Sequence, residues 1–450
     1  DLYLPRLYNA ESAAARALAE LAGTKPAADS HSVRTALEFG VRSSSVELTM
    51  EQVESIYGAL RSRCIIITGG PGTGKTTVIK AIINGFRSLN LEFVLCAPTG
   101  RAAKRMTETT GVDAKTIHRL LEYNPSNNSF NRDRDNPLRA SAVVVDEVSM
   151  IDIELMSFML DALAPGSRLV LVGDKDQLES VGPGAVLRDC LASAHIPCTT
   201  LTEIHRQAEL SLVVVNSHRI LNGRGLRHEP VQGGKTDFFF MEKGDPEAAV
   251  ETILEMVAKR IPSRFGHDPI RDVQVITPMY KGQLGAQNLN AALQERLNPT
   301  GAEVRKGDRI FRPGDRVMQT KNDYDREVFN GDIGFVSQVG PEGLTVRLAD
   351  GRKVMYGDGD LDELMLAYAV TVHKSQGSEY PVVVLALHTQ HFVMLRRNLL
   401  YTAVTRGKEL VVVVGTRRAA ETAIRKDFTR KRHTRLGERI KHSIEYGHVG

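Results

Sequence analysis

The sequence predicts an α/β fold in which helices cover parallel sheets, with a small β-barrel inserted in the second half of the chain. Short runs of Val, Ile and Leu alternate with helical patterns along most of its length, as parallel sheets require. A glycine-rich segment, Gly69–Thr76, separates the first of these runs from a helical pattern. At 450 residues the chain exceeds what one hydrophobic core usually supports, so we expect two or three domains.

The N-terminal half is expected to form a short stub and one α/β domain. Residues 1–45 contain one helical pattern, Glu11–Ala22, followed by a Ser-rich link, and we interpret them as the stub. The domain is expected at residues 46–205, where the strand candidates are Cys64–Thr68, Glu92–Ala97, Ala142–Val145 and Arg168–Val172. Residues 122–139 interrupt the alternation and are too hydrophilic for a core, so they predict a protruding hairpin or loop.

A second α/β domain is expected at residues 206–311 and 365–450, with strand candidates Val273–Thr277, Val382–Leu387 and Leu410–Val414. Between its two parts, residues 312–364 consist of short β-rich runs separated by Asn-Gly, Pro-Glu-Gly and Asp-Gly turns, which favours a small inserted barrel. The C-terminal stretch Arg417–His442 has a helical pattern dense in Arg and Lys. That pattern is typical either of a solvated helix or of a phosphate-facing surface.

The composition is typical of a globular protein, but it does not indicate which kind of molecule the protein binds. A hydrophobic share of 42% is ordinary for a globular protein, and a formal net charge of +4 does not by itself indicate nucleic acid. No apolar run approaches the about 20 residues that cross a bilayer, so we expect no membrane segment. The four cysteines lack C-x-x-C spacing, which favours buried thiols in a reducing cytoplasm over a zinc site. Because the chain starts at Asp1 without Met, we expect a fragment of a longer protein.

The segment Gly69-Gly-Pro-Gly-Thr-Gly-Lys-Thr76 fits the phosphate-loop pattern G-x-x-x-x-G-K-S/T. It stands between a strand-like run and a helical pattern, where backbone N–H groups at a helix N-terminus can cradle phosphates. Lys75 should reach the β- and γ-phosphates of a nucleoside triphosphate, and the Thr76 hydroxyl should ligate Mg²⁺. The residues expected to bind the nucleotide here are Gly70, Pro71, Gly72, Thr73, Gly74, Lys75, Thr76 and Thr77.

Two further strand ends carry polar residues suited to phosphoryl transfer. Asp146 and Glu147 follow the run that ends at Val145. Asp146 should hold the same Mg²⁺, and Glu147 is placed to orient or deprotonate the attacking water. The alternative for this pair is a helix N-cap. Gln177 follows the next strand candidate and could sense the γ-phosphate without altering charge, the alternative being an ordinary loop residue.

The order of these segments resembles that of superfamily 1 helicases and, within them, the RecD type of superfamily 1B, the alpha-subunit family of exodeoxyribonuclease V and its stand-alone relatives. The resemblance covers roughly residues 48–416, from Leu48-Thr-Met-Glu-Gln52 to Tyr401-Thr-Ala-Val-Thr-Arg-Gly407. Its most family-specific part is Val372-His-Lys-Ser-Gln-Gly-Ser-Glu379. The resemblance implies two RecA-like P-loop NTPase domains, the second of which carries residues 312–364 as an SH3-like barrel.

The resemblance also implies roles for single residues. Gln52 matches a glutamine that reads the adenine edge. Arg206 and Arg406 match arginine fingers, the alternative being ordinary surface arginines. Gly377 and Glu379 lie in a motif that touches the nucleotide while responding to DNA. The segments that resemble single-strand contacts contain Pro98, Thr99, Arg101, Thr116 and His118 in the first domain and Thr371, His373 and Ser375 in the second. The two histidines could equally be structural.

The resemblance implies an ATP-dependent DNA helicase or translocase that uses ATP and Mg²⁺ and moves 5′→3′ on single-stranded DNA. Its implied role is in DNA repair or recombination. The implied partners are single-stranded DNA and junctions of single- and double-stranded DNA, bound by a monomeric motor; a protein partner could bind through the N-terminal region that relatives carry. Residues 122–139 stand where relatives carry a strand-splitting pin, with Tyr123 and Phe130 as their aromatics. The alternatives are an RNA-directed ATPase, a non-catalytic subunit of a nuclease complex and a relaxase-associated motor.

Overall fold

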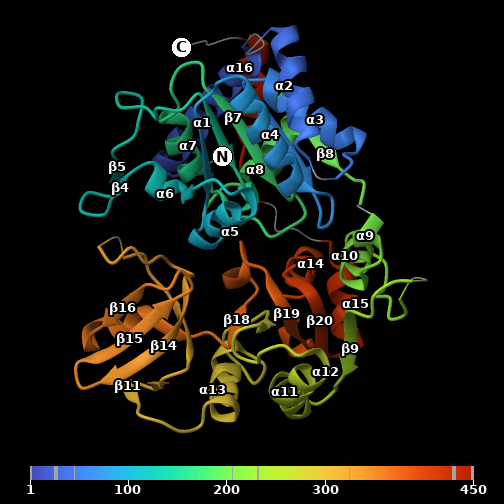
Figure 1. Ribbon diagram of the computed structural model, residues 1–450, viewed down its shortest axis with the longest axis vertical. Helices are drawn as coiled ribbons and strands as arrows, with labels where there is room; N and C mark the ends of the chain where they lie inside the picture. Colours follow the sequence, from blue (N-terminus) through green and yellow to red (C-terminus); the bar gives the residue numbers. More distant parts are fainter. Residues whose placement is uncertain are drawn as a thin grey trace. The chain divides into compact units, whose positions relative to one another are not determined.

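The computed structural model describes residues 3–24, 29–44, 46–204, 206–230, 233–323, 325–427 and 432–446 (Figure 1). The chain forms two compact units. Unit 1 comprises Asp1–Arg206 and Arg430–Gly450, and unit 2 comprises Gln207–Thr429. No described helix is both long enough and apolar enough to cross a membrane.

Unit 1 is built on a six-stranded parallel sheet with the strand order β3-β2-β6-β7-β1-β8. The strands are β1 (Cys64–Gly69), β2 (Phe93–Ala97), β3 (Ala114–Thr116), β6 (Ala142–Val145), β7 (Arg168–Gly173) and β8 (Cys198–Leu201). All residues of β1, β6 and β7 are buried. Helices therefore cover both faces of the sheet, which explains why the central strands read as continuous apolar runs.

Successive residues of the central strands contribute to two cores, one on each face. Ile65 and Ile67 pack with α2 (Ser30–Arg42), α3 (Met50–Arg61), α4 (Lys75–Ser88) and α5 (Gly100–Thr110). Cys64 and Ile66 pack on the other side, where the helices are α1 (Pro5–Gly23), α6 (Ile117–Leu120), α7 (Ile153–Asp161), α8 (Val186–Ser193) and α16 (Leu436–Tyr446). A 3-10 turn, η1 (Val148–Met150), follows β6.

Both ends of the chain differ from the sequence expectation. The Ser-rich link contains α2, which Asp29 caps by accepting hydrogen bonds from the N–H groups of His31 and Ser32. Its apolar residues Val33 and Ala36 are buried, so residues 30–42 form a helix rather than a link. The C-terminal helical pattern is divided into α15 (Arg417–Arg425) and α16, and α16 packs against α1 and α8 in unit 1. The expectation had grouped residues 365–450 in one domain.

Unit 2 contains a five-stranded parallel sheet with the order β18-β10-β19-β20-β9. Its strands are β9 (Phe238–Glu242), β10 (Val273–Thr277), β18 (Ala369–Thr371), β19 (Tyr380–Leu387) and β20 (Gly407–Gly415). Its longer helices are α10 (Leu212–Leu221), α11 (Pro246–Glu255), α13 (Ala286–Leu297), α14 (Arg397–Val404) and α15. Its shorter helical segments are the π-helical η2 (Met256–Arg260), α12 (Ile261–Phe265), η4 (His373–Ser375) and η5 (Thr389–His391). Helix α9 (Arg206–Glu209) spans the point at which unit 1 ends.

An antiparallel five-stranded sheet is inserted in unit 2 between β10 and β18, with the order β16-β15-β14-β13-β17. Its strands are β13 (Arg316–Gln319), β14 (Ile333–Gly340), β15 (Gly343–Leu348), β16 (Lys353–Tyr356) and β17 (Leu364–Leu366). The hairpin β11 (Val304–Lys306) and β12 (Arg309–Phe311) precedes it, and the turn η3 (Asp358–Glu363) leads into β17. Phe311 and Tyr356 are the largest side chains of its separate core.

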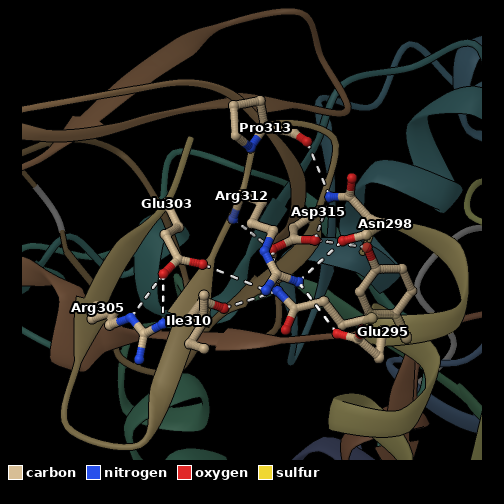
Figure 2. Close-up of polar contacts among 10 residues, drawn as sticks. Glu295, Asn298, Glu303, Arg305, Ile310, Arg312, Pro313 and Asp315 are labelled. Atoms are coloured by element: carbon tan, nitrogen blue, oxygen red, sulfur yellow. Dashed lines mark hydrogen bonds and ion pairs between the residues drawn. The ribbon is translucent and has the colours of Figure 1, made fainter. Parts of the chain in front are cut away.

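A buried carboxylate joins this insertion to the rest of unit 2 (Figure 2). Asp315 is 0% exposed and accepts four hydrogen bonds, from the N–H of Arg312 and from the side chains of Gln294, Asn298 and Tyr368. The first two side-chain donors lie on or just after α13, and the third directly precedes β18. Burial, and then the charge of Asp315, raise the pKa of the Tyr368 hydroxyl far above its usual value, so it stays a donor.

Replacing Asp315 with alanine is expected to destabilise unit 2 by about 3–5 kcal/mol, because several buried donors lose their acceptor at once. Thermal unfolding followed by calorimetry measures the loss. The matched control is Asp308→Ala in the turn between β11 and β12, where the side chain is exposed. A midpoint for the Asp315 variant equal to that of the control would show that the carboxylate does not anchor the insertion.

Candidate active site

The phosphate loop connects β1 to α4, as the motif predicts. Gly72 and Gly74 have φ values of 77° and 81°, a left-handed conformation that glycine adopts without strain. Thr73 is 1% exposed, and its hydroxyl donates to the carbonyl of Gly70 at 2.9 Å. The remaining loop residues Gly70, Pro71, Gly72, Gly74, Lys75, Thr76 and Thr77 are partly exposed. The loop is thus folded around the N-terminus of α4, whose first N–H groups lack helical partners.

The side chains of Lys75 and Gln52 both donate hydrogen bonds to backbone carbonyls of this loop. Lys75 Nζ donates to the carbonyls of Gly69 at 2.7 Å and Gly70 at 3.0 Å. Gln52 is 0% exposed; its Nε2 donates to the carbonyl of Thr73 at 2.9 Å, and its Oε1 accepts the N–H of Thr49. The structure therefore brings Gln52 to the phosphate loop, while its reading of adenine stays a prediction.

The acidic pair lies at the carboxyl end of β6. The Asp146 carboxylate accepts the N–H of Glu147 at 2.8 Å. Burial, and then the charge of Glu147, raise the pKa of Asp146 to about 6, whereas the nearby cations Arg105 and Lys75 lower it. Glu147 has a φ of 54°, is 7% exposed and forms an ion pair with Arg105 at 3.7 Å. A left-handed glutamate costs about 1–3 kcal/mol, and such strain concentrates at functional sites.

Gln177 follows β7 and is buried, with 8% of its surface exposed. Its Nε2 donates to Asp174 at 3.3 Å, but its Oε1 has no hydrogen-bond partner among the described residues. An unsatisfied buried acceptor costs about 1–3 kcal/mol, so it calls for a functional explanation. The N–H of Lys175 donates to Thr68 Oγ1 at 3.2 Å, which ties this loop to the end of β1.

These residues converge because β6, β7 and β1 are neighbours in a parallel sheet. Their carboxyl ends meet at one edge, which is where open α/β sheets bind ligands. The edge carries a cation from Lys75, carboxylates from Asp146 and Glu147, and the amide of Gln177. Such a set can neutralise phosphate charge, hold a divalent cation and accept a proton from water.

A second group of predicted residues comes together in unit 2. Arg406 is 2% exposed, which excludes the alternative of a surface arginine. Its guanidinium donates to the carbonyls of Thr402 and Ser378, each at 3.1 Å. Gly377, with a φ of 69°, and Glu379, which pairs with Lys408 at 3.2 Å, flank that second carbonyl. Arg206 begins α9, and its side chain lies outside the described residues.

The predicted nucleic-acid contacts of unit 1 lie at neighbouring strand ends, since Ala97 of β2 pairs with Thr116 of β3. Thr99 and Thr116 cap α5 and α6 by accepting helix N–H groups at 3.3 and 3.1 Å. Pro98 and Arg101 are half-buried beside Thr99. The hydroxyls are therefore engaged as helix caps.

Within residues 122–139, β4 (Tyr123–Asn124) and β5 (Ser129–Phe130) pair as a short antiparallel hairpin. Its two aromatic rings lie 5.1 Å apart. His118 packs against both, at 5.6 and 5.7 Å, and Phe158 of α7 packs against Phe130 at 4.9 Å. Burial lowers the pKa of His118, so the ring is neutral near pH 7 and buttresses the hairpin.

In unit 2 the predicted contacts follow β18. Thr371 accepts the N–H of Lys374 at 3.4 Å, and His373 is half-buried, with its pKa lowered by burial and then by Arg396. Ser375 is 0% exposed and donates its hydroxyl to the carbonyl of Val372 at 2.7 Å. Its hydroxyl therefore stabilises the turn after β18.

Three further residues of unit 1, which the motifs did not predict, contact the predicted site residues or the segments next to them. Arg105 pairs with Glu147. Glu51 accepts the N–H groups of Thr202 and Glu203 at 2.6 and 3.1 Å, at the end of unit 1. Arg432 contacts the loop after Gln177. Glu51 directly precedes Gln52 in the sequence, and that position is the one signal that could have indicated it. The contacts of Arg105 and Arg432 depend on tertiary folding, so no sequence pattern indicates them.

Three family models match the chain. Residues 52–183 match an AAA domain, residues 289–349 the SH3 domain of ATP-dependent RecD-like DNA helicases, and residues 366–414 a UvrD-like helicase C-terminal domain. Among solved structures, a Bacteroides Pif1 helicase in complex with ADP-AlF3 and ssDNA is similar with a TM-score of 0.51 and 20% identity, over 83% of this chain and 94% of that one. The predicted fold class, two RecA-like domains with an inserted SH3-like module, is confirmed.

Curated relatives extend the match along almost the whole chain. The ATP-dependent RecD2 DNA helicase of Deinococcus radiodurans is 38% identical over 98% of this chain, which spans 58% of that protein's length. The RecD subunit of the RecBCD enzyme from Mycolicibacterium smegmatis is 31% identical over 87% of this chain and 75% of its own length. On this evidence, the chain belongs to the RecD-type helicase family.

Proposed function

We propose that the chain is the motor of an ATP-dependent DNA helicase that moves 5′→3′ along single-stranded DNA. The convergence of Lys75, Asp146, Glu147 and Gln177 at one edge of the unit 1 sheet carries the proposal. The similarity to the ATP-dependent RecD2 DNA helicase of Deinococcus radiodurans supports DNA as the substrate. The 5′→3′ direction rests on the resemblance to the RecD branch.

Within unit 1, Lys75 neutralises the β- and γ-phosphates of ATP while the loop N–H groups hold them. Glu147 accepts a proton from the attacking water, and the Gln177 amide oxygen, which has no described partner, contacts the reacting groups. Gln52 couples the base to the loop through Thr73. Arg206 and Arg406 supply charge to the transferring phosphoryl group, and Gly377 and Glu379 flank Ser378, whose carbonyl Arg406 bonds.

Mg²⁺ fits the donor set at this edge. Asp146 is a half-buried carboxylate whose pKa is raised by burial and then by the charge of Glu147, and a bound cation would favour its charged form. Among the described residues no cluster of three or more His, Cys, Asp or Glu could hold a metal, and Mg²⁺ needs none, since one or two protein ligands and phosphate oxygens suffice. Asp146 and the Thr76 hydroxyl would hold the ion, which when bound neutralises phosphate charge.

Single-stranded DNA is proposed to bind along the helix caps of unit 1 and the turn after β18 in unit 2. The segments concerned are those of Pro98, Thr99, Arg101, Thr116 and His118 and those of Thr371, His373 and Ser375. Backbone N–H groups and small hydroxyls contact phosphates without sequence preference, as a translocating protein requires. We place this activity in DNA repair or recombination in the cytoplasm, where cysteines such as the free Cys64 and Cys96 stay reduced.

ATP hydrolysis measured with single-stranded DNA or RNA of equal length tests the proposal. DNA should stimulate hydrolysis more strongly than RNA, and affinity for DNA should fall steeply as salt rises. Stronger stimulation by RNA would favour the RNA-directed ATPase. Hydrolysis that neither polymer stimulates would contradict the motor, and the absence of any hydrolysis would favour the non-catalytic subunit.

The hairpin of β4 and β5 is proposed to be the wedge that splits the duplex. Replacing Tyr123 and Phe130 together with alanine removes the ring contacts of the hairpin. The rate of strand displacement should fall at least about tenfold, which corresponds to the loss of one base-stacking contact. DNA-stimulated ATP hydrolysis should stay at the wild-type rate. The control is Ser126→Ala at the exposed hairpin tip. Equal loss of both activities would show that the hairpin supports the fold rather than unwinding.

A further inference from the structure

Two exposed aromatic side chains of unit 2 follow neighbouring strands of its parallel sheet. Tyr280, which follows β10, is 47% exposed, and Phe392, which follows β19, is 66% exposed. β10 pairs in parallel with both β19 and β18, so all three strands end at one edge of the sheet. The N–H of Val372, in the turn after β18, donates to the carbonyl of Thr277 at the end of β10 at 3.0 Å. Both rings therefore lie at the edge where open α/β sheets bind ligands, which is also the edge of the predicted DNA contacts of unit 2.

The two rings are carried by loops whose backbones are hydrogen-bonded in place. The carbonyl of Tyr280 accepts the N–H of Gln287 at 3.0 Å, which ties its loop to α13. The N–H of Phe392 donates to the carbonyl of Thr389 at 3.0 Å, at the end of η5. The loop backbones are thus ordered although the rings are exposed. A base that stacks on either ring would order few further groups, which favours binding.

The three strand ends also carry positive charge without a carboxylate. Residues 278–285, 371–375 and 388–398 contain no Asp or Glu. Lys281 follows Tyr280, and Arg396 lies in the same loop as Phe392. Neither cation forms an ion pair or a side-chain hydrogen bond with any residue that the structure describes. Two aromatic rings and two uncompensated cations therefore share one edge of the sheet.

Single-stranded nucleic acid matches both halves of this chemistry. Its phosphates complement the cations, and every base has a π-face that can stack on an aromatic ring whatever the sequence. An acidic protein surface would satisfy the cations but would leave the rings without a specific partner. A purely apolar surface would bury the cations without compensation. The combination of rings and cations is the one that proteins use to hold single strands without sequence preference.

We propose that Tyr280 and Phe392 form a base-stacking platform for single-stranded DNA on unit 2, and that Lys281 and Arg396 bind the phosphates beside it. The inference rests on the proposed function. It extends the DNA contacts of unit 2 from the turn after β18 to the ends of β10 and β19. The rings hold bases while the cations hold the backbone, so the two kinds of contact can be separated by experiment.

Phe392→Ala tests the stacking contact. The Kd for a single-stranded oligonucleotide, measured by fluorescence anisotropy without nucleotide, should rise about fivefold or more, the lower end of the range for loss of one stacked base. The slope of log Kd against log salt should match the wild type, because no phosphate contact is lost. The thermal midpoint should also be unchanged, since the ring is exposed. The matched control is Phe265→Ala, which removes a 37% exposed ring at the end of α12 and should bind DNA as the wild type does.

An oligonucleotide of equal length that carries no bases gives a measurement that a merely structural role of the ring would not change. The wild type and the Phe392→Ala variant should bind this abasic chain equally, because the ring then has no base on which to stack. Comparing the two proteins on the two oligonucleotides is a double-mutant cycle between the ring and the bases. Tyr280→Ala should give the same pattern, with an unchanged KM for ATP.

Arg396→Ala tests the phosphate contact. It should lower the slope of log Kd against log salt by about 0.7, the value for one phosphate contact on a single strand. The reduction should be the same on the abasic chain. The control is Arg271→Ala, which removes an exposed arginine near the amino end of β10, at the opposite edge of the sheet. That variant should keep the wild-type slope.

Four results would overturn one or other part of the account. A Phe392→Ala variant with wild-type affinity for DNA, or one that loses equal affinity for the abasic chain, would show that the ring does not stack on bases. A Tyr280→Ala variant that only raises the KM for ATP would assign its ring to the nucleotide instead. An unchanged slope in the Arg396 variant would remove the phosphate contact. A wild-type protein that does not bind single-stranded DNA would contradict the proposed function itself.

Discussion

Replacing Lys75 with alanine is expected to lower ATP hydrolysis by at least about 10²–10³-fold, the loss that follows removal of a preorganised charge or donor at a transition state. The ammonium lies within 2.7–3.0 Å of the carbonyls of Gly69 and Gly70, so it is already held at the phosphate loop. Its charge also lowers the pKa of Asp146. Steady-state phosphate release at saturating ATP and single-stranded DNA measures the effect.

The matched control is Lys80→Ala, which removes an exposed lysine from the same helix. Both variants should bind single-stranded DNA as tightly as the wild type, as measured by fluorescence anisotropy without nucleotide. Full turnover by the Lys75 variant would show that the edge of the unit 1 sheet is not the hydrolytic site.

Replacing Arg406 with alanine is expected to reduce kcat by about 10³–10⁵-fold, the range that arginine fingers contribute to phosphoryl transfer. The residue is buried in unit 2 between α14 and the turn that precedes β19, and it bonds the carbonyls of Thr402 and Ser378. It is therefore poised by the same segment that carries Gly377 and Glu379. Single-turnover hydrolysis with excess enzyme measures the chemical step.

Loss of buried hydrogen bonds would also lower stability, so Arg406 needs two controls. Arg406→Lys keeps a positive charge without the planar fork and should remain at least partly impaired in kcat. Arg418→Ala removes an exposed arginine of α15 and should be neutral. If the alanine variant hydrolyses ATP at the wild-type rate, Arg406 acts only within the fold of unit 2.

Strands that are buried on both faces could be predicted from the sequence. Val273–Thr277 coincides with β10, and Cys64–Thr68 with all but the last residue of β1, because such strands are uninterrupted apolar runs. The edge strand β8 was missed because Cys-Thr-Thr-Leu is short and mostly polar or exposed. Helix α2 was missed because its serines obscured the buried positions Val33 and Ala36.

The meeting of Lys75, Asp146, Glu147 and Gln177 at one edge of the unit 1 sheet could be predicted from motif and strand position, but their conformations could not. The left-handed Glu147 and the unsatisfied amide oxygen of Gln177 depend on how neighbouring strands end. Arg432 illustrates the larger gap. The helical pattern over Arg417–His442 predicted a solvated or phosphate-facing surface. Arg432 instead hydrogen-bonds Ser180, which lies 252 residues earlier in the sequence. Such a pairing is specified by the fold of both segments together.

Strand displacement on duplexes that carry a single-stranded tail at the 5′ or the 3′ end tests the central claim most directly. With ATP present, the wild-type protein should displace the strand from the 5′-tailed duplex and leave the 3′-tailed duplex intact. The Lys75→Ala variant should displace neither. Displacement from the 3′-tailed duplex alone would reverse the proposed direction, and a protein that hydrolyses ATP but displaces no strand would contradict the helicase.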